Sequence, residues 1–537
     1  MNQQKTLTLS DVISKMKSVS PDDIALITKA HDFAMDAHKD LKRFSGEPYF
    51  VHLIGTAYNL AELGMGPITV AAGFLHDSIE DVPVPAETIQ REFGSEILFL
   101  VEGVTKLGKI RYKGSERHNE SLRKLFIATS QDIRVLIIKL ADRLHNIGTL
   151  QFVRPEKQVR IATETLQIYA PIAYRLGIRK LSRQLEDLSF PYVYPEEYRK
   201  VKDLLKEKKN ETEKSLSKFQ KNLHKELAKN DYRDVSIQYR IKGLFSLWWK
   251  LQKKGNDIEK IYDINAVRVI VPTVADCYQV LGLVHTVWRP LPGRIKDYIA
   301  FPKPNGYRSI HTTIFVGDGT IVEIQIKTKE MYEEGEYGIA SHISYKEGGH
   351  SKSKTNFHWI QQLLSRIPIT TKDQPQSSTV TPKWIKDLVE YQKHNLDNDS
   401  YQHNLQGDYL KERIFVFTPR GDVVDLPIDS TPIDFAYTIH SDIGNHTVGA
   451  KINGKYSTLS EKLKNGEIVE IESRKNGKPN IKWLDFVKTT IAQRHIRNYF
   501  ELPARPSKKS KSPKKAKLKR KIIQIKTIIF IFLYFFM

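Results

Sequence analysis

Histidines and aspartates recur in the first third of the chain in a pattern that could hold a metal ion. His52 is followed by the adjacent pair His76 and Asp77 and then by Asp142, so two imidazoles and two carboxylates come from separate stretches. A nitrogen and oxygen donor set without thiolates suits Mn²⁺, Fe²⁺ or a similar ion with positions left open for water and substrate. Such an ion lowers the pKa of bound water and polarises a phosphoryl oxygen. The pattern therefore predicts a metal centre that acts on a phosphoryl group.

Two further acids follow this histidine–aspartate pair. Glu80 comes four residues after His76, and Asp81 comes four residues after Asp77, so a helix that continues to Pro83 would place all four groups on one face. A lone His-Asp dipeptide is weak evidence, but the full order with HDSIED and the apolar-framed run KLADRLHN is far more specific. Four other histidines of this region are expected to be structural: His31, His38, His118 and His145.

Cations gather in the middle of the chain. No GxxxxGK[ST] loop occurs, so a triphosphate would not be bound by a P-loop. Arg240 and Lys242 precede Ser246 and Lys250, which lie one helical turn apart, and these side chains could bind a polyphosphate directly. The segment GRIKDYIAFPKPNGYRSIHTT adds a dense set of polar residues: Arg294, Lys296, Asp297, Lys303, Asn305, Tyr307 and His311.

Two acids accompany these cations. Asp263 opens the run DINAVRVIV, and Glu323 stands in TIVEIQIKT. Carboxylates that enter one site from different strands can hold the Mg²⁺ ions that phosphoryl transfer requires. Tyr307 among the cations could stack on a purine. Each residue also has a plain structural interpretation: a strand cap for Asp263, the polar face of a strand for Glu323, and a turn-packing aromatic for Tyr307.

The elements that must position these residues follow from periodicity. Residues 1 to about 195 show apolar residues at three- and four-residue spacing, which predicts helices, and a Lys/Glu-rich stretch from Tyr198 to Asn230 predicts a long exposed linking helix. Alternating and β-branched runs then predict a mixed α/β unit. Residues 349–410 read as a linker with short helices around Trp359 and Trp384, and ERIFVFTPRGDVVDLP predicts a hairpin that begins a compact region.

Composition limits the class of protein. The chain has 537 residues, 40% of them hydrophobic and 27% charged, which is a balance typical of several folded domains. Its 84 Lys and Arg against 62 Asp and Glu give a net charge of +22, which favours anionic partners, but eleven basic residues lie between Arg505 and Lys526. The single cysteine, Cys277, excludes an internal disulfide framework, and with the absence of a signal-peptide pattern it indicates a cytoplasmic location.

The C-terminal end combines this basic run with an apolar one. The unbroken apolar stretch after Lys526 has eleven residues, against roughly 20 needed to span a bilayer. Weak contact with a membrane surface and a frameshifted or truncated end are both open interpretations of this tail.

The N-terminal motifs resemble a known family. FSGEPYFVHL, AAGFLHDSIED, KLADRLHN and ETLQIYAPIAYRLG are similar to the hydrolase half of the RelA/SpoT homologues, enzymes of the stringent-response alarmone (p)ppGpp. The resemblance implies an all-α, HD-type domain in which Mn²⁺ drives removal of the 3′-pyrophosphate. It also implies the following roles: His52, His76, Asp77 and Asp142 as metal ligands, Glu80 and Asp81 as the acidic pair that activates or positions water, and Arg43 and Asn146 as substrate contacts.

The middle region resembles the (p)ppGpp synthetase domain of the same family, an α/β nucleotidyltransferase-like fold. That domain moves the β,γ-pyrophosphate of ATP to the 3′-hydroxyl of GDP or GTP. The implied roles are these: Arg240, Lys242, Ser246 and Lys250 on the ATP phosphates, Asp263 and Glu323 on Mg²⁺, Glu323 also as the base, Tyr307 as the guanine stacker, Lys303, Asn305 and His311 near the acceptor, and Arg294 and Lys296 in the RxKD form of bifunctional members.

The C-terminal motifs FVFTPRGDVVDLP and STPIDFAYTIHSDIGNHTVGAKING resemble the TGS domain, a small β-grasp module that in long members helps to read tRNA at the ribosome. The predicted organisation is a hydrolase domain (1–195), a connecting helix (196–230), a synthetase domain (231–348), a linker (349–410), a TGS domain (411–475), a following segment (476–504) and a tail (505–537). The leading hypothesis is a bifunctional enzyme that makes and degrades (p)ppGpp. The alternatives are a hydrolase with an inactive, regulatory synthetase domain and a tRNA- or membrane-binding regulator.

Overall fold

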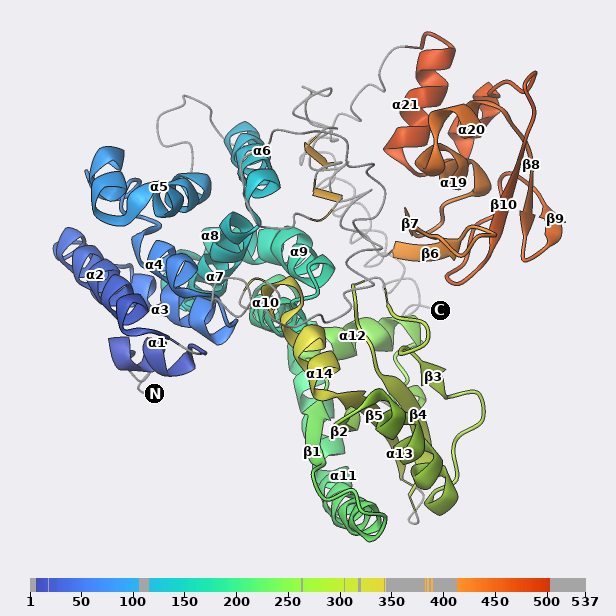
Figure 1. The fold of residues 1–537 in the computed structure, drawn as a ribbon, viewed down its shortest axis with the longest axis horizontal. Helices are drawn as coiled ribbons and strands as arrows, with labels where there is room; N and C mark the ends of the chain where they lie inside the picture. Colours follow the sequence, from blue (N-terminus) through green and yellow to red (C-terminus); the bar gives the residue numbers. More distant parts are fainter. Residues whose placement is uncertain are drawn as a thin grey trace, which may run out of the picture.

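The computed structural model describes residues 6–17, 19–105, 115–261, 264–303, 305–316, 320–341, 343, 382, 384–385, 388–389 and 413–502. They form a helical unit, a mixed α/β unit and a small C-terminal unit of short strands and helices (Figure 1). This order confirms the fold class expected from the sequence. The predicted linker falls almost wholly outside the described residues, as do Trp359, Asp263 and the basic and apolar tail.

The helical unit runs from α1 to α10 and buries one continuous apolar core. Several helices begin where the sequence supplies a proline in the first turn or a capping side chain; Ser20, for example, forms a capping box with Asp23 at the start of α2. The helices are α1 (Leu9–Lys15), α2 (Pro21–Ala37), α3 (Phe50–Glu62), α4 (Pro67–Leu75), α5 (Ala86–Val104), α6 (Ser115–Gln131), α7 (Arg134–Gly148), α8 (Pro155–Glu164), α9 (Ala170–Arg175) and α10 (Arg179–Val193). A short 3₁₀ turn, η1 (Leu150–Phe152), precedes α8, and a π-helical turn, η2 (Thr165–Tyr169), joins α8 to α9.

One local prediction in this unit is wrong. The helix that carries His76 was expected to continue to Pro83, but α4 ends at Leu75, and residues 76–81 form consecutive turns. The backbone N–H of Asp81 still donates to the carbonyl of Asp77, at 2.9 Å, so the two acids stay close to the pair that precedes them. Short polar side chains such as these compete with the helical backbone for hydrogen bonds, which favours turns over helix.

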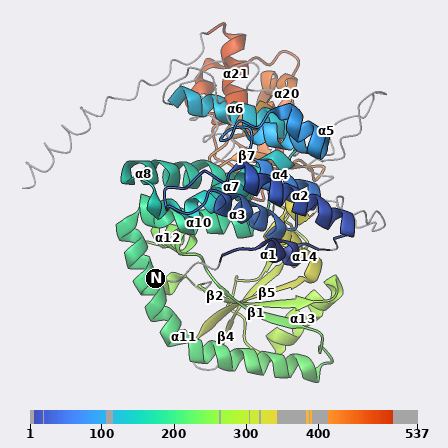
Figure 2. The same ribbon diagram turned by 90° about the vertical axis from the view of Figure 1, so that its left-hand side faces the viewer.

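A 35-residue helix, α11 (Pro195–Lys229), connects the helical unit to the α/β unit (Figure 2). Its existence confirms the predicted linking helix, but the expectation of an exposed helix is wrong along one face. Val201 packs in a cluster with Leu247 of α12 (Leu244–Lys253), and Phe219 and Leu223 are buried in the core of the sheet. The sparse leucines and aromatics of this Lys/Glu-rich stretch are therefore a narrow apolar stripe, and burial of that stripe fixes the helix against the α/β unit.

The α/β unit is built on one five-stranded mixed sheet, with strand order β1-β2-β5-β4-β3. Strands β2 and β5 are parallel neighbours, and the other pairs are antiparallel. The strands are β1 (Ser236–Ile241), β2 (Asn265–Val271), β3 (Lys296–Asp297), β4 (Ile310–Phe315) and β5 (Ile321–Thr328). The helices are α12 (Leu244–Lys253), η3 (Ile258–Lys260), α13 (Val274–Val287) and α14 (Lys329–Tyr337). Cys277 lies buried on α13, as expected of a structural thiol.

The C-terminal unit starts with the predicted hairpin, β6 (Arg413–Phe417) paired antiparallel with β7 (Val423–Pro427). A three-stranded sheet follows, with strand order β10-β8-β9. Its elements are α19 (Pro432–Ile439), α20 (Ser441–Asn445), β8 (Thr447–Ile452), β9 (Lys455–Ser457), β10 (Val469–Ser473), η5 (Ile481–Asp485) and α21 (Thr490–Tyr499). Buried Asp434 of α19 accepts hydrogen bonds from the backbone N–H groups of Lys488 and Thr489, at 2.9 and 2.7 Å, and so fastens the last helix to this unit. Within the described parts of the chain, every helix is too short or too polar to cross a membrane.

Candidate metal centre and nucleotide site

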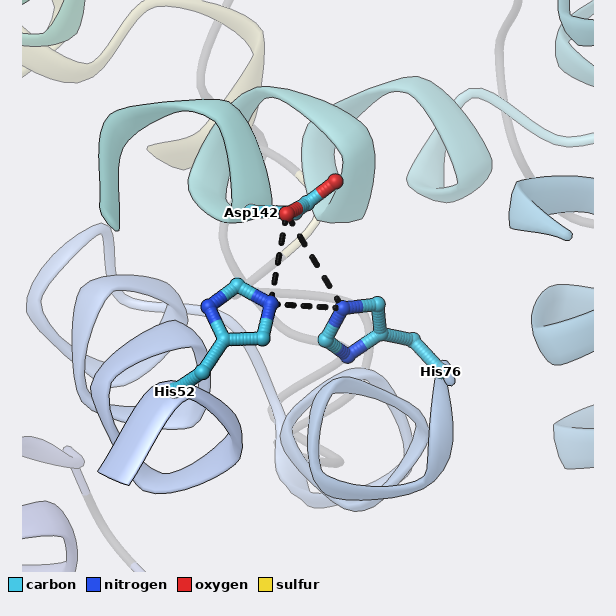
Figure 3. Close-up of side chains that lie close together, drawn as sticks. All are labelled: His52, His76 and Asp142. Atoms are coloured by element: carbon cyan, nitrogen blue, oxygen red, sulfur yellow. Dashed lines mark hydrogen bonds and ion pairs between the residues drawn. The ribbon is translucent and has the colours of Figure 1, made fainter. Parts of the chain in front are cut away.

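The three helical segments predicted to supply metal ligands converge in the helical unit. His52 comes from α3, His76 follows the end of α4, and Asp142 comes from α7, and Figure 3 shows the three side chains facing one another. His52 Nε2 lies 3.3 Å from His76 Nε2 and 3.4 Å from Asp142 Oδ1. Asp77 Oδ2 lies 3.1 Å from His76 Nε2 and 3.4 Å from His52 Nε2. Four predicted donor atoms therefore face one small volume, and His52, His76 and Asp142 form a group that could hold a divalent metal ion.

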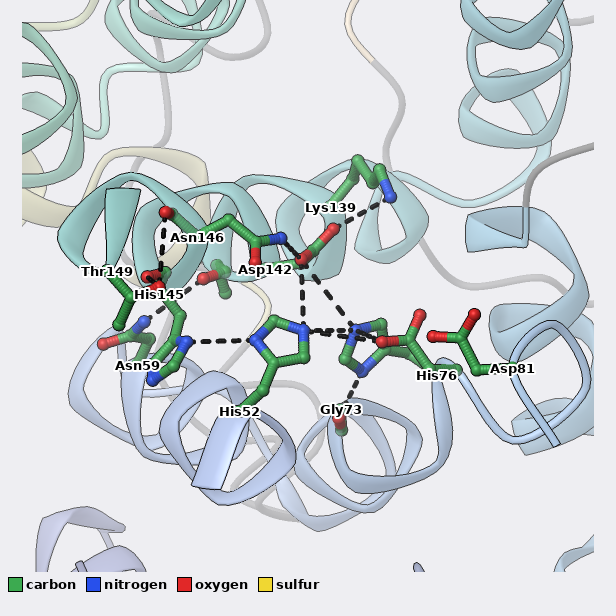
Figure 4. A network of polar contacts seen from close by, with 12 residues as sticks. His52, Asn59, Gly73, His76, Asp81, Lys139, Asp142, His145, Asn146 and Thr149 are labelled. Atoms are coloured by element: carbon green, nitrogen blue, oxygen red, sulfur yellow. Dashed lines mark hydrogen bonds and ion pairs between the residues drawn. The ribbon is translucent and has the colours of Figure 1, made fainter. Parts of the chain in front are cut away.

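The far side of each imidazole is held by a second hydrogen bond (Figure 4). His76 Nδ1 lies 2.8 Å from the carbonyl oxygen of Gly73, which can only accept, so Nδ1 carries a proton and Nε2 is the ring nitrogen that faces the centre. His52 Nδ1 lies 3.0 Å from Nδ1 of His145. Burial, with the nearby His52 and Arg43, lowers the pKa of His145 to about 3, so His145 is neutral and can accept this bond. Second partners of this kind orient metal-ligating histidines.

The two carboxylates are held in the form that a metal requires. Burial alone would raise the pKa of Asp142, but Lys139, whose Nζ lies 2.8 Å from Asp142 Oδ2, together with His52 and His76 outweighs burial and keeps the pKa well below its usual range. Asp77 is half-buried, and although burial would raise its pKa, His76 and His52 keep that pKa well below normal. Ionised carboxylates beside oriented imidazoles fit a divalent cation.

Tyr49 links this centre to the acidic pair, and sequence reasoning missed it. Its hydroxyl lies 2.9 Å from Asp77 Oδ2 and 2.5 Å from Asp81 Oδ2. Burial, with Asp77 and Asp81, raises the pKa of Tyr49, so the phenol stays protonated and donates to the carboxylates. The available signal was position, because Tyr49 stands at the start of α3, three residues before His52. Glu80 is half-buried in the same turn as Asp81.

The two predicted substrate contacts of this centre lie together. An Nη of Arg43 donates to Asn146 Oδ1 at 2.9 Å and to Thr149 Oγ1 at 3.3 Å. Asn146 Nδ2 in turn donates to Asp142 Oδ1 at 2.5 Å. Arg43 and Asn146 therefore form a polar extension that begins at Asp142, a predicted metal ligand.

His145 is the second residue that sequence reasoning missed, since it was expected to be structural. It lies three residues after Asp142 on α7, so the two share a helix face. Gly55 makes room for its ring, because a Cβ at position 55 would lie 2.2 Å from His145 Cδ2.

This contact gives a first prediction. His145→Ala is expected to weaken Mn²⁺ binding about 10-fold to 100-fold, because His52 loses the partner that fixes its ring. Gly55→Ala, which displaces the His145 ring, is expected to act in the same direction. The affinity is measured by calorimetric titration of the metal-stripped full chain with Mn²⁺. His224→Ala, which removes an exposed imidazole on α11, is the matched control, and affinity equal to that of wild type in both test variants would contradict the assignment.

In the α/β unit, three predicted residues form one set of polar contacts: His311 lies on β4, Glu323 on β5, and Tyr307 in the loop just before β4. Tyr307 OH lies 2.8 Å from His311 Nε2, and His311 Nδ1 lies 3.2 Å from Glu323 Oε1. Gln325 on the same strand as Glu323 donates to Glu323 Oε1 at 2.8 Å. Lys327 donates to Tyr307 OH at 3.0 Å. Burial raises the pKa of Tyr307, but Lys327, His311 and Arg179 outweigh it and lower the pKa well below normal.

The surroundings of Tyr307 differ from an open base platform. The side chain is only 4% exposed, and the guanidinium of Arg179, from α10 of the helical unit, lies over the ring at 4.0 Å from its centroid. The stacking role expected for Tyr307 stays a prediction, and it requires a conformation in which the ring is uncovered. Lys303 lies nearby, at 5.5 Å from the ring centroid, and burial lowers its pKa to about 8.

Cations outnumber acids around this set. Arg183 of α10 and Arg268 of β2 both pair with Glu336 of α14, the latter at 2.7 Å. Arg240 is close enough to Arg183 and Arg268 that, after burial, their charges further lower its pKa. A buried excess of positive charge favours an anionic ligand such as a polyphosphate.

The remaining predicted residues are spread more widely. Ser246 and Lys250 lie one turn apart on α12, Lys242 lies just before this helix, and Asn305 is adjacent to Gly177 of the helical unit. Arg294 and Lys296 are exposed, although Lys296 is the strand partner of His311. Asp263 lies outside the described residues, so its place relative to Glu323 stays a prediction.

Comparison with family models divides the chain into three matches. Residues 30–179 match the HD domain, residues 239–350 match the region found in RelA / SpoT proteins, and residues 414–472 match the TGS domain. The first match includes the candidate metal ligands, and the second includes the set formed by Tyr307, His311 and Glu323.

Full-length comparisons give the same result. The chain is 42% identical over 502 residues to a guanosine-3′,5′-bis(diphosphate) 3′-pyrophosphohydrolase of Aquifex aeolicus, covering 93% of this chain and 68% of that protein. It is 43% identical over 485 residues to a GTP pyrophosphokinase of Myxococcus xanthus, covering 89% of this chain and 61% of that protein. The chain thus spans about two thirds of the length of these relatives.

Proposed function

The chain belongs to the RelA/SpoT family, and from this membership we propose that it both makes and degrades (p)ppGpp. One observation carries the proposal most directly: His52, His76, Asp77 and Asp142 direct four donor atoms at one volume beside the acidic pair Glu80–Asp81. Relatives named as a pyrophosphohydrolase and as a pyrophosphokinase support both directions of the chemistry.

For hydrolysis, the 3′-diphosphate of (p)ppGpp would lie over the metal centre, and water would displace pyrophosphate to leave GDP or GTP. The proposed ion is Mn²⁺, which suits imidazole and carboxylate donors and would supply Lewis acidity toward a phosphoryl oxygen and a lowered pKa for water. Glu80 and Asp81 would orient the attacking water and take up its proton. Arg43 and Asn146, which are hydrogen-bonded to each other, would contact the nucleotide.

For synthesis, the 3′-hydroxyl of GDP or GTP would attack the β-phosphorus of ATP, and AMP would leave. Glu323 is the proposed base for that hydroxyl proton, and with Asp263 it is proposed to hold Mg²⁺, which would neutralise charge on the phosphates. Arg240, Lys242, Ser246 and Lys250 would bind the triphosphate of ATP, and Tyr307, Lys303, Asn305 and His311 would bind the acceptor nucleotide.

A second candidate function follows from the buried Tyr307. Because Arg179 covers its ring, the α/β unit could bind nucleotide without catalysing transfer, and the chain would then be a hydrolase with a regulatory nucleotide site. Contact of the C-terminal unit with tRNA, the ribosome or a membrane surface is not part of either proposal.

One experiment separates these functions. Purified full chain is incubated with ATP labelled at the γ-phosphate, GDP and Mg²⁺ without Mn²⁺, and the products are resolved by anion exchange. Labelled ppGpp that forms and then disappears on addition of Mn²⁺ is the expected result of the bifunctional proposal. Absence of labelled ppGpp, together with loss of added authentic ppGpp in Mn²⁺, would favour the hydrolase alone. Persistence of authentic ppGpp would contradict both.

A further inference from the structure

Helix α12 of the α/β unit receives its N-terminal cap from a different unit. Its N-cap residue is Gly243, which has no side chain to accept a hydrogen bond from the first turn, although every α-helix begins with four N–H groups that lack helical partners. Asp187 of α10 supplies the acceptor: its Oδ1 lies 3.0 Å from the backbone nitrogen of Phe245, and the carboxylate also accepts from the N–H of Leu244. The two helices are adjacent in the fold (Figure 1).

The glycine is needed for this contact. A Cβ at position 243 would lie 2.6 Å from Asp187 Oδ2, so any larger residue there would displace the carboxylate. An aromatic cluster fixes the two helices next to the cap, since the ring centroid of Phe190 on α10 lies 5.4 Å from those of both Phe245 and Trp248 on α12.

The neighbouring acid holds a side chain of the same helix. Ser246 Oγ donates to Glu186 Oε2 at 3.3 Å. Both acids are half-buried: burial, with the charge of Asp187, raises the pKa of Glu186 to about 7, and burial raises the pKa of Asp187 as well. Adjacent carboxylates that are partly removed from water are costly unless they are hydrogen-bonded, and both of these are hydrogen-bonded to α12.

The consequence concerns the residues that α12 carries. Ser246 and Lys250 project from its first two turns and are, by the proposed function, contacts of the ATP phosphates. Their position relative to the sheet depends on where the N-terminus of α12 is held. The holding groups stand on α10, which belongs to the unit that contains the metal centre.

We propose that Asp187 and Glu186 are positioning residues for pyrophosphate transfer: from the helical unit, they fix the helix that binds the ATP phosphates. This inference rests on the proposed function, because it takes ATP as the ligand of α12. Asp187 does so by capping the backbone and Glu186 by orienting Ser246, and neither contacts the reacting atoms.

The test compares Asp187→Ala with Asp187→Asn in the full chain, because asparagine keeps an oxygen that can accept from Phe245 N–H and alanine does not. Asp187→Ala is expected to raise the KM for ATP about tenfold, the scale of a lost N-cap, with a smaller change in kcat. Asp187→Asn is expected to restore the KM to within about twofold of wild type. Hydrolysis of ppGpp in Mn²⁺ should be unchanged in both variants and reports that the helical unit is folded.

A second measurement tests directly whether the N-terminus of α12 is capped. Hydrogen exchange of the peptide that contains Leu244 and Phe245 should be faster in Asp187→Ala than in Asp187→Asn or wild type. Glu196→Ala, which removes an exposed carboxylate from the first turn of α11, is the matched control and should change neither exchange at α12 nor the KM.

Three results would overturn the inference. These are an unchanged KM in Asp187→Ala, a lower KM in that variant, which would mean that the carboxylate competes with phosphate, and an equal loss in Asp187→Asn. If wild type makes no ppGpp, the proposed synthesis fails instead, and the dissociation constant of a non-hydrolysable ATP analogue with Mg²⁺ then replaces the KM in the same comparison.

Discussion

Replacement of His76 by alanine is expected to reduce hydrolysis of ppGpp about 10³-fold, while synthesis from ATP and GDP stays within about twofold of wild type. His76 directs Nε2 at the centre because its Nδ1 is bonded to Gly73, and Nε2 lies within 3.3 Å of His52 Nε2 and 3.1 Å of Asp77 Oδ2. Removal of this imidazole leaves an incomplete donor set beside the carboxylates of Asp77 and Asp142. The lost metal contribution of several kcal/mol corresponds to that drop in rate.

The measurement is release of pyrophosphate from ppGpp in Mn²⁺, with synthesis assayed on the same preparation. His224→Ala removes an exposed histidine of α11 and should keep both rates. Chelation of the metal from wild type, followed by return of Mn²⁺, should abolish and then restore hydrolysis, whereas His76→Ala should not recover at matched Mn²⁺. Hydrolysis at the wild-type rate in His76→Ala would show that the His76 imidazole is not part of the metal centre.

Glu323→Gln is expected to lower synthesis of ppGpp about 10³-fold, within the range for loss of a general base, and to leave hydrolysis unchanged. Glutamine keeps the shape of the side chain, so the packing of β5 should persist, but it can neither accept the hydroxyl proton nor offer a charged ligand to Mg²⁺. The carboxylate has the geometry for this role, since Oε1 lies 3.2 Å from His311 Nδ1 and 2.8 Å from Gln325 Nε2.

The readout is transfer of label from γ-labelled ATP to GDP at saturating substrate, so that the loss appears in kcat. Glu330→Gln, which replaces an exposed carboxylate in the first turn of α14 by a carboxamide, is the matched control. If Glu323→Gln makes ppGpp at the wild-type rate, another group must accept the proton of the 3′-hydroxyl. If wild type itself is inactive in synthesis, the substitution should have no effect, and the second candidate function gains support.

Much of the candidate site could be predicted because its residues stand in short motifs. His76 and Asp77 are adjacent, Asp142 lies in an apolar-framed helix, and Glu323 lies in an alternating strand, so residue type and period alone indicate both chemistry and element. The predictions failed where local pattern competes with packing. Glu80 and Asp81 lie on turns instead of a continued helix. Helix α11 buries one of its faces, although its Lys/Glu-rich sequence predicts an exposed helix.

Periodicity, capping and donor chemistry are properties of short stretches, so the order of the helical, α/β and small β units and the candidate metal donors could be predicted from the amino-acid sequence. The packing of separate elements placed the more distant partners: His145 of α7 behind the imidazole of His52, Tyr49 beside Asp77, and Asp187 of α10 at the start of α12, 58 residues from Phe245. Hydrogen bonds act only over about 3 Å, so contacts between residues far apart along the chain depend on how distant elements pack, and the pattern of a short motif does not reveal them.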